Sequence, residues 1–509
     1  MATSKWTWSF AGCLFVLVVA AVTRLHELEL RPLHSDEGVN HFFVEEVRRE
    51  GFYRYSHENY HGPLYFYLAT ATTHFFGDDS FGLRMSGVVP GLAVVVLAFF
   101  FIWSTAHSSA VSTATLAGCL VALSPSMVFY ARYAIHETLF LVLSLWFAYA
   151  TFRWITDRAP KWLFHLAVGG ALLVATKETV VITFFAIAVG GILAIGRDVR
   201  SVCTSLWAQR SVVIESLLAA GVLIVAIYTA GFTWWEGMGE LVAALPQWVG
   251  RSNPSGEHSK PVAYYLSEVI LPTEPYLLLL PLLVPLAMLA ERDRGRDLRV
   301  GLFLCGWCLA SFAVYSCVSY KTPWLIGNST LPALLLLAWS LASLLSYTLP
   351  SRVVTLAIVG VTVFLAIDRA LKLNYRTVPI LGSPLAAAAP FGETNPFSYV
   401  HTTQELVAAA DQIVAFVKDH PKSNVLVALS SYWPLPFYLR PIRDRLQYLS
   451  ATNIEPYLDN FQVFVVDADV ELPEQQWQQL PFVVMDGRHG KVFFRRSPVV
   501  GPRDDRPIS

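Results

Sequence analysis

Residues 31–38 read RPLHSDEG, and an amphipathic run, VNHFFVEEVRREG, continues the chain to Gly51. The segment YHGPLY follows at 60–65, and apolar runs long enough to span a membrane flank the whole stretch. Unpaired charge is costly in hydrocarbon, so a charged loop between spans must face water or take part in chemistry. We therefore interpret residues 31–63 as the catalytic loop of a membrane enzyme.

The composition is that of a membrane protein. Of 509 residues, 54% are hydrophobic and only 15% are charged, which favours many spans over several soluble domains. The net charge of -1 gives no indication of a nucleic-acid partner. All six cysteines lie in or beside apolar runs, so no disulfide framework is predicted. Residues 6–25 could be a signal peptide, but their length favours an uncleaved first span.

Apolar stretches close to the roughly 20 residues that a helix needs to cross a bilayer predict the spanning helices. Eleven are expected, at about 6–25, 85–103, 109–124, 137–155, 162–176, 178–196, 211–232, 272–290, 300–318, 324–347 and 352–370. With the N-terminus in the cytoplasm, Arg153, Arg158 and Lys161 stay inside, as the positive-inside rule requires. The odd number of spans then places the chain after about residue 372 outside the cytoplasm, together with residues 31–63.

The sequence predicts two parts. Residues 1–372 form a multi-span helical part with a first external loop at 26–84, and residues 373–509 have the composition of a soluble domain. Thr402 and Glu405 form a capping-box pattern that opens a helix. Residues 424–430 and 461–467 are predicted as buried strands, and 482–495 as a hairpin. The expected fold is a polytopic α-helical membrane protein with an extracytoplasmic α/β domain at its C-terminus.

The acidic pair Asp36 and Glu37 supplies the candidate catalytic residues. Group transfer to a hydroxyl needs a carboxylate within hydrogen-bond reach of the proton that is removed, and Asp36 fits the role of general base. A leaving group that is already a phosphate needs no acid, so one carboxylate can suffice. The pair could instead serve only the start of a helix, with Ser35 or Asp36 as the cap and Glu37 at the positive end.

Four basic residues expected near the same face are candidates to bind a donor phosphate: Arg132, Lys177, Lys321 and Arg84. Fixed positive charge in a site shielded from water stabilises a departing phosphate. Each of them alone could instead be a side chain that snorkels at the end of a span.

Five further residues are candidates for positioning the substrate: His61, His136, Glu137, Glu178 and Trp324. Three of them, His136, Glu137 and Glu178, could also supply ligands to a divalent metal together with Asp36. These loops hold no Asp-x-Asp pair, however, so the metal stays open and no cofactor is assigned. Lys177 and Glu178, adjacent in the sequence, could simply neutralise each other.

These features resemble the glycosyltransferase superfamily C, whose members include protein O-mannosyltransferases and lipid A aminoarabinose transferases. The resemblance rests on a first span, the acidic pair in the first external loop, the HGPL element at 61–64 and many later spans. Other segments are more similar to a prokaryotic branch, the flippase activity-associated membrane proteins: ARY at 131–133, ATKE at 175–178, KTPW at 321–324, NPFSYVHT at 395–402 and YWPLPFYLR at 432–440. This similarity covers nearly the whole chain.

The resemblance implies a polyprenyl-phosphate-linked sugar as donor, inversion at the anomeric carbon, and Asp36 as the aspartate base. It also implies a multi-pass protein of the cell (inner) membrane that acts on an acceptor glycan, lipid or protein. Two positions depart from the mannosyltransferase pattern. Gly62 stands where those proteins usually have a proline, and no matching aspartate precedes Glu137, so acceptor and metal assignments do not carry over.

Two other functions fit parts of the sequence. A non-catalytic partner or translocation factor for lipid-linked glycans would use the same cations to hold pyrophosphate, and Asp36 would then be structural. A secondary transporter would place charged residues at mid-depth in paired spans, and the predicted spans are almost free of them.

Overall fold

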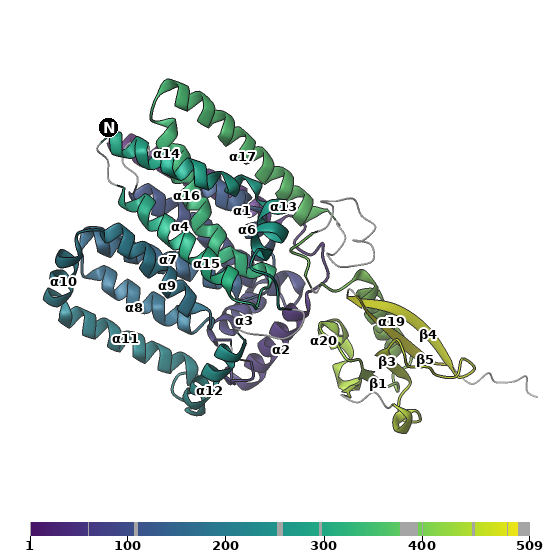
Figure 1. Ribbon diagram of the computed structural model, residues 1–509. Helices are drawn as coiled ribbons and strands as arrows, with labels where there is room; N and C mark the ends of the chain where they lie inside the picture. Colours follow the sequence, from purple (N-terminus) through teal and green to yellow (C-terminus); the bar gives the residue numbers. More distant parts are fainter. Residues whose placement is uncertain are drawn as a thin grey trace, which may run out of the picture. The chain divides into compact units, whose positions relative to one another are not determined.

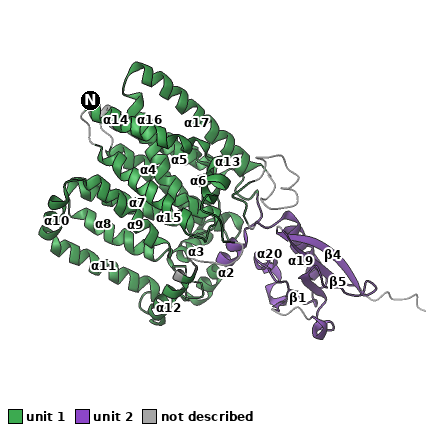
Figure 2. Cartoon of the chain, viewed as in Figure 1, with its two compact units in different colours: residues 1–30, 43–381, 390–399 green, residues 31–42, 382–389, 400–509 purple. Residues whose placement is uncertain are grey.

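The computed structural model describes residues 2–59, 61–105, 110–251, 258–294, 298–376, 395–399, 401–449, 454–485 and 487–496. The chain divides into two compact units (Figure 2). The first, which we call the helical unit, comprises Met1–Leu30, Phe43–Leu381 and Pro390–Tyr399. The second, the sheet unit, comprises Arg31–Phe42, Gly382–Ala389 and Val400–Ser509. Residues 31–42, which carry the acidic pair, therefore group with the C-terminal residues.

Helices make up nearly all of the described helical unit (Figure 1). The longer ones are α1 (Ala2–Leu25), α3 (Leu64–Phe76), α4 (Ser80–Thr105), α5 (Ala110–Leu123), α7 (Glu137–Asp157), α8 (Lys161–Val174), α9 (Val180–Ile195), α10 (Val199–Ala208), α11 (Arg210–Tyr228), α12 (Glu236–Arg251), α14 (Leu280–Asp293), α15 (Arg299–Cys317), α16 (Gly327–Leu345) and α17 (Leu349–Tyr375). The shorter ones are α6 (Pro125–Ala131), η1 (Tyr265–Ile270), α13 (Leu271–Thr273), η2 (Pro275–Leu279) and η3 (Pro323–Ile326). Helix α2 (Ser35–Glu50) begins in the sheet unit and ends in the helical unit.

Each of the eleven predicted apolar stretches overlaps a helix, because in lipid a lone segment satisfies its backbone hydrogen bonds only as a helix. Within the described residues, eight helices are long and apolar enough to span a membrane, or up to ten if each of two bent pairs is one span. The bent pairs are α5 with α6, at 60°, and α9 with α10, at 113°. The remaining predicted span, 162–176, is the 14-residue helix α8. The chain is a multi-pass membrane protein, as predicted.

The bend between α5 and α6 has a local cause. Pro125 lacks the N–H that a continuing helix would need, so α5 ends before it. The Ser124 hydroxyl then accepts a hydrogen bond from Met127 N and starts α6 in a new direction. The short helix that follows brings Tyr130 and Arg132 to the end of the bundle.

Helix α16 is the buried centre of the helical unit, where it packs against α5, α14, α15 and α17 (Figure 1). Of the most apolar 18-residue stretch in Pro323–Leu345, which contains α16, 94% of the residues are buried. In the most apolar stretches of α11 and α17, only 17% and 22% of the residues are buried. Most apolar side chains of these two helices are therefore left to face lipid.

The sheet unit holds five strands in the order β2-β1-β3-β5-β4. They are β1 (Val425–Ala428), β2 (Leu446–Tyr448), β3 (Val463–Asp467), β4 (Trp477–Met485) and β5 (Arg488–Arg495). Strand β1 is parallel to β2 and β3, and β5 is antiparallel to β3 and β4. The other elements are α19 (Gln404–Asp419), α20 (Leu435–Leu439), η4 (Arg440–Arg445) and η5 (Glu455–Tyr457). The prediction of a small α/β domain is confirmed.

One local prediction in the sheet unit is wrong, and one strand was not predicted. The N-cap of α19 is Thr403, whose hydroxyl accepts from Leu406 N, and not Thr402. The Thr402 hydroxyl donates to Leu33 O instead. Strand β2 has no counterpart in the prediction, because three residues are too few to show a pattern.

Candidate functional site

The turn that carries His61 is fixed against the end of α8. Gly62 N donates to Thr176 O at 3.2 Å, and Leu64 N donates to Ala175 O at 3.0 Å. A Cβ atom on residue 62 would lie 2.1 Å from Ala175 O, so this approach requires glycine. Close backbone packing therefore accounts for the glycine at a position where mannosyltransferases usually have proline.

Two acid–base pairs follow from this packing, the first half-buried and the second buried. His61 Nδ1 lies 2.9 Å from Glu178 Oε2, and Lys177 Nζ forms an ion pair with Glu137 Oε1. Lys177 and Glu178 thus have different partners and do not simply neutralise each other. Burial alone would raise the pKa of Glu178, but the charge and hydrogen bond of His61, with the charge of Lys177, lower it to about 2. Burial would lower the pKa of Lys177, but Glu137 and Glu178 outweigh that effect and raise it.

His136 is the N-cap residue of α7 and is buried among aromatic rings. Its ring centroid lies 4.2 Å from that of Tyr65, 4.6 Å from that of His61 and 5.1 Å from that of Phe66. Burial, with the charges of His61 and Lys177, holds the pKa of His136 well below its ordinary value. Its Nε2 atom has no hydrogen-bond partner among the described residues. His136 is therefore a neutral imidazole with one unsatisfied nitrogen.

The two candidate arginines hold the segment that follows α1. Arg84 Nη1 donates to Leu28 O at 2.8 Å. Arg132 donates to the carbonyl oxygens of His26 and Glu27, at 2.5 and 2.6 Å. Positive charge is favourable beside carbonyls at the C-terminal end of a helix, so both contacts stabilise the exit of the chain from α1.

Lys321 lies just beyond the end of α15. Its Nζ donates to Val318 O and, at 3.2 Å, to Lys260 O. Its backbone N donates to His258 O at 2.9 Å. Burial lowers the pKa of the Lys321 amine. The described partners of this amine are neutral carbonyls.

A narrow cavity of the helical unit is bounded by α1, α4, α6, α7, η3 and α16. Its wall includes Arg24, Tyr130, Glu137 and Trp324. Three of these side chains have a buried polar atom without a hydrogen-bond partner among the described residues: Arg24 Nε, Tyr130 Oη and Glu137 Oε2. A donor, a hydroxyl and an acceptor thus line the same cavity as an indole ring, and such a set can bind hydroxyl groups.

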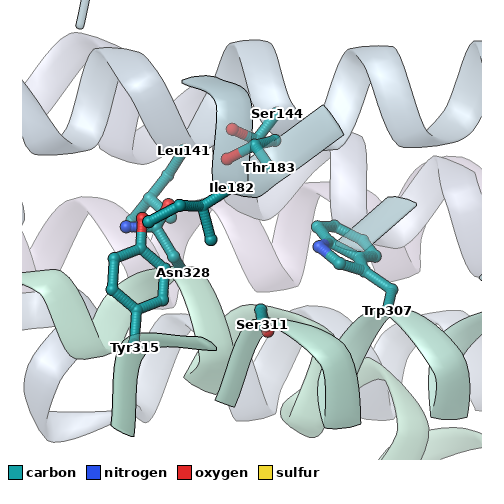
Figure 3. A pocket seen from close by; sticks show the side chains of 8 residues that line it. All are labelled: Leu141, Ser144, Ile182, Thr183, Trp307, Ser311, Tyr315 and Asn328. Carbon is teal, nitrogen blue, oxygen red and sulfur yellow. The ribbon is translucent and has the colours of Figure 1, made fainter. Parts of the chain in front are cut away.

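A second cavity lies between α7, α9, α15 and α16 (Figure 3). Its described wall consists of Leu141, Ser144, Ile182, Thr183, Trp307, Ser311, Tyr315 and Asn328, and includes none of the predicted site residues. We assign it no role.

The acidic pair lies in the sheet unit, in the first turn of α2. His34 is the N-cap residue, since its carbonyl oxygen accepts from Gly38 N at 3.2 Å. Its Nδ1 accepts from Asp36 N at 3.0 Å. Glu37 is fully buried, and its Oε2 accepts from His34 N at 2.8 Å. The side chain of Asp36 is 51% exposed, so the two acids of the pair have different environments.

The segment at 432–440 packs against this turn. A Cβ atom on Gly38 would lie 2.5 Å from Pro434 Cβ, so glycine is needed for the approach. Leu33 N donates to Tyr438 Oη at 2.7 Å. Two stretches that carry the resemblance, although about 400 residues apart, are therefore in contact.

The candidate imidazoles and carboxylates of the helical unit do not assemble a metal site. Among the described residues, no three of their ligand atoms lie within 4.8 Å of one another. We therefore assign no metal to this group. Tyr60, the first residue of the YHGPLY segment, lies outside the described residues.

Three further residues emerge only from the structure: Arg24, Glu274 and His34. Glu274 is buried, and its Oε1 accepts from Ser126 N at 3.2 Å and from Ser126 Oγ at 2.9 Å, which ties the break before η2 to α6. An acid or arginine inside an apolar run is a signal that could have marked Arg24 and Glu274. His34 offers no such signal, because it lies in a polar loop and not in an apolar run.

A family model described as dolichyl-phosphate-mannose-protein mannosyltransferase matches residues 60–228. This segment contains most of the predicted site residues of the helical unit and ends before Lys321. No curated protein sequence matches the chain.

Solved structures match nearly the whole chain. ArnT from Cupriavidus metallidurans bound to undecaprenyl phosphate has a TM-score of 0.61 and 17% identity, over 99% of this chain and 100% of that one. Its apo state has a TM-score of 0.60 and 16% identity, over 97% and 98%. The archaeal oligosaccharyltransferase AglB from Archaeoglobus fulgidus, with an inhibitory peptide and a dolichol-phosphate, has a TM-score of 0.56 and 11% identity, over 91% and 70%. At such identities the likeness establishes the fold alone.

Proposed function

We propose that this chain, which has the fold of the glycosyltransferase superfamily C, transfers a sugar from a polyprenyl-phosphate donor to an acceptor hydroxyl. Two proteins of similar fold support the donor class, since one is bound to undecaprenyl phosphate and the other to a dolichol-phosphate. In this proposal the reaction takes place at the extracytoplasmic side of the cell (inner) membrane. The closer resemblance to the flippase activity-associated branch remains a prediction.

The observation that carries the proposal is the set of three polar atoms, unsatisfied among the described residues, in the wall of the narrow cavity of the helical unit. Unsatisfied buried polar atoms are costly, and sugar hydroxyls would satisfy those in its wall. A sugar hydroxyl can accept from Arg24 Nε, exchange a hydrogen bond with Tyr130 Oη, and donate to Glu137 Oε2.

The chemistry is a single displacement. Asp36 removes the proton of the acceptor hydroxyl, whose oxygen then forms a bond to the anomeric carbon of the donor sugar. The bond from that carbon to the phosphate oxygen breaks, and the polyprenyl phosphate leaves with the electron pair. One displacement from the opposite face inverts the configuration.

Among the four cations, Lys321 is our first candidate for the donor phosphate. Lys177 is paired with Glu137, and Arg84 and Arg132 hold the backbone after α1. The amine of Lys321 has neutral carbonyl partners, so its charge can offset the growing charge of the phosphate.

The contacts of the four cations also favour a second function. All four cations contact protein groups, as a structural role predicts. A non-catalytic partner or translocation factor for lipid-linked glycans would need such a scaffold and no general base.

The test is a transfer assay on the purified full chain in lipid nanodiscs. Radiolabelled polyprenyl-phosphate mannose, glucose and arabinose are offered with an extract of cell-envelope glycans and lipids as acceptor. We expect one donor to release polyprenyl phosphate, and Lys321→Ala to weaken donor binding while Lys372→Ala, on the half-exposed face of α17, does not. Binding of undecaprenyl phosphate without turnover of any donor would contradict the enzyme and favour the partner function.

A further inference from the structure

We propose that His34 and Glu37 form a capping box that positions the general base Asp36, and that only Asp36 of the acidic pair takes part in the chemistry. This inference rests on the proposed function, because Asp36 is a base only there. Glu37 and His34 are positioning residues: they act through the backbone of the first turn of α2.

The hydrogen bonds have the pattern of a capping box. In the usual form, a serine or threonine at the N-cap accepts from an N–H of the first turn, and a glutamate or glutamine three residues later accepts from the N-cap N–H. Here His34 Nδ1 accepts from Asp36 N at 3.0 Å, and Glu37 Oε2 accepts from His34 N at 2.8 Å. An imidazole thus replaces the usual hydroxyl. Because it accepts, Nδ1 carries no proton, and the proton of the neutral ring is on Nε2.

The carboxylate of Asp36 is left out of this box. Its Oδ2 lies 3.8 Å from His34 Nδ1, too far for a hydrogen bond, and that nitrogen has no proton to donate. The box therefore fixes the backbone of Asp36 while its half-exposed carboxylate can still meet an acceptor hydroxyl. This separation is what a rigidly held general base requires.

The carboxylate of Glu37, unlike that of Asp36, is part of the box. Its side chain is fully buried, and its Oε2 already accepts from His34 N. Glutamine offers the same acceptor oxygen at this position, so Glu37→Gln should keep the capping box. A catalytic or metal-binding carboxylate would not tolerate the same change.

The sheet unit holds the residue that precedes the box. Leu33 N donates to Tyr438 Oη at 2.7 Å, and Leu33 O accepts from the Thr402 hydroxyl. Both backbone groups of Leu33 are therefore bound by residues of the C-terminal part. This gives the C-terminal domain a role: it anchors the turn that carries the base.

The experiment compares matched pairs of variants in the full chain. His34→Asn keeps an acceptor near the position of Nδ1, and His34→Leu has a similar volume without one. Glu37→Gln keeps the acceptor, and Glu37→Ala removes it. We expect His34→Asn and Glu37→Gln to keep kcat within about threefold, and the other two to lose roughly 10- to 100-fold in kcat with little change in donor KM. Adding His34→Leu to Asp36→Asn should change the residual rate no further.

A readout that needs no activity is hydrogen exchange of the Asp36 amide, which should be faster in His34→Leu than in His34→Asn. Equal losses in Glu37→Gln and Glu37→Ala would overturn the proposal, as would a further loss when His34→Leu is added to Asp36→Asn. Equal amide exchange in the two His34 variants would overturn the capping box itself. If the wild type turns over none of the three donors, the proposed function fails together with the positioning role, and hydrogen exchange alone then decides on the box.

Discussion

At Asp36, one substitution separates chemistry from structure. His34 and Glu37 make the cap of α2, so asparagine at position 36 should leave the helix intact. It removes the base, and turnover should fall by about 10²–10⁴-fold. Donor turnover and a thermal melt in detergent check this, with Asp444→Asn as the control because that side chain is 96% exposed. Wild-type turnover in a folded Asp36→Asn protein would show that Asp36 is not the base.

The ion pair of Lys177 and Glu137 has side chains only 5% and 4% exposed. Lys177→Met leaves a buried carboxylate without its counter-charge, and such a loss costs about 3–5 kcal/mol. The double variant Lys177→Met with Glu137→Gln removes both charges. It should recover most of the melting temperature that Lys177→Met alone loses. A matched control is Lys372→Met: its partner is Asp368, the two side chains are 44% and 28% exposed, and the expected cost is at most about 1 kcal/mol. A double variant as unstable as the single one would contradict this account.

At the scale of elements, the contact between the turn at 61–64 and the end of α8 depends on Gly62. Gly62→Ala puts a Cβ atom 2.1 Å from Ala175 O, a backbone atom that cannot move without shifting α8. The variant should have a lower melting temperature. It should also lose activity, because the displaced turn would move His61 away from Glu178. Gly221→Ala, which meets open space in α11, is the control and should be neutral or stabilising. Unchanged melting of Gly62→Ala would show that the turn is not tightly held.

Elements that depend on the pattern of their own residues could be predicted from the sequence. Features that depend on packing between residues far apart in the chain could not. Long apolar runs predicted the spanning helices, and short apolar runs predicted β1 and β3, because burial leaves few other structures open to them. Pro125 is a visible break, but the 60° between α5 and α6 depends on what packs around it. In the candidate site, the sequence identified Lys177 as a cation but could not choose Glu137 over Glu178 as its partner. The grouping of residues 31–42 with the sheet unit rests on contacts with Thr402 and Tyr438 that no local pattern shows.

At the scale of the whole molecule, the 14 residues of α8 decide the membrane topology. A helix of that length is about 21 Å long, shorter than the roughly 30 Å of hydrocarbon. If α8 spans with its flanking residues, the total is eleven, and a reporter fused after Ser509 should be active only in the exported compartment. A reporter inserted after Ala159, in a basic loop expected inside, should be active only in the cytoplasm. Cytoplasmic activity after Ser509 would reverse the assignment of faces.

The bond between Leu33 and Tyr438 joins residues 405 positions apart, and this separation is also a delay in time. A ribosome that adds roughly 5–20 residues per second needs about 20–80 s to make the intervening chain. Through that interval the first loop exists without its anchor. A chain cut short before Tyr438, by a premature stop or a protease, would keep its spanning helices and still lack a fixed base. Residues made long after the first loop thus complete it, and chains that lack Tyr438 should be inactive.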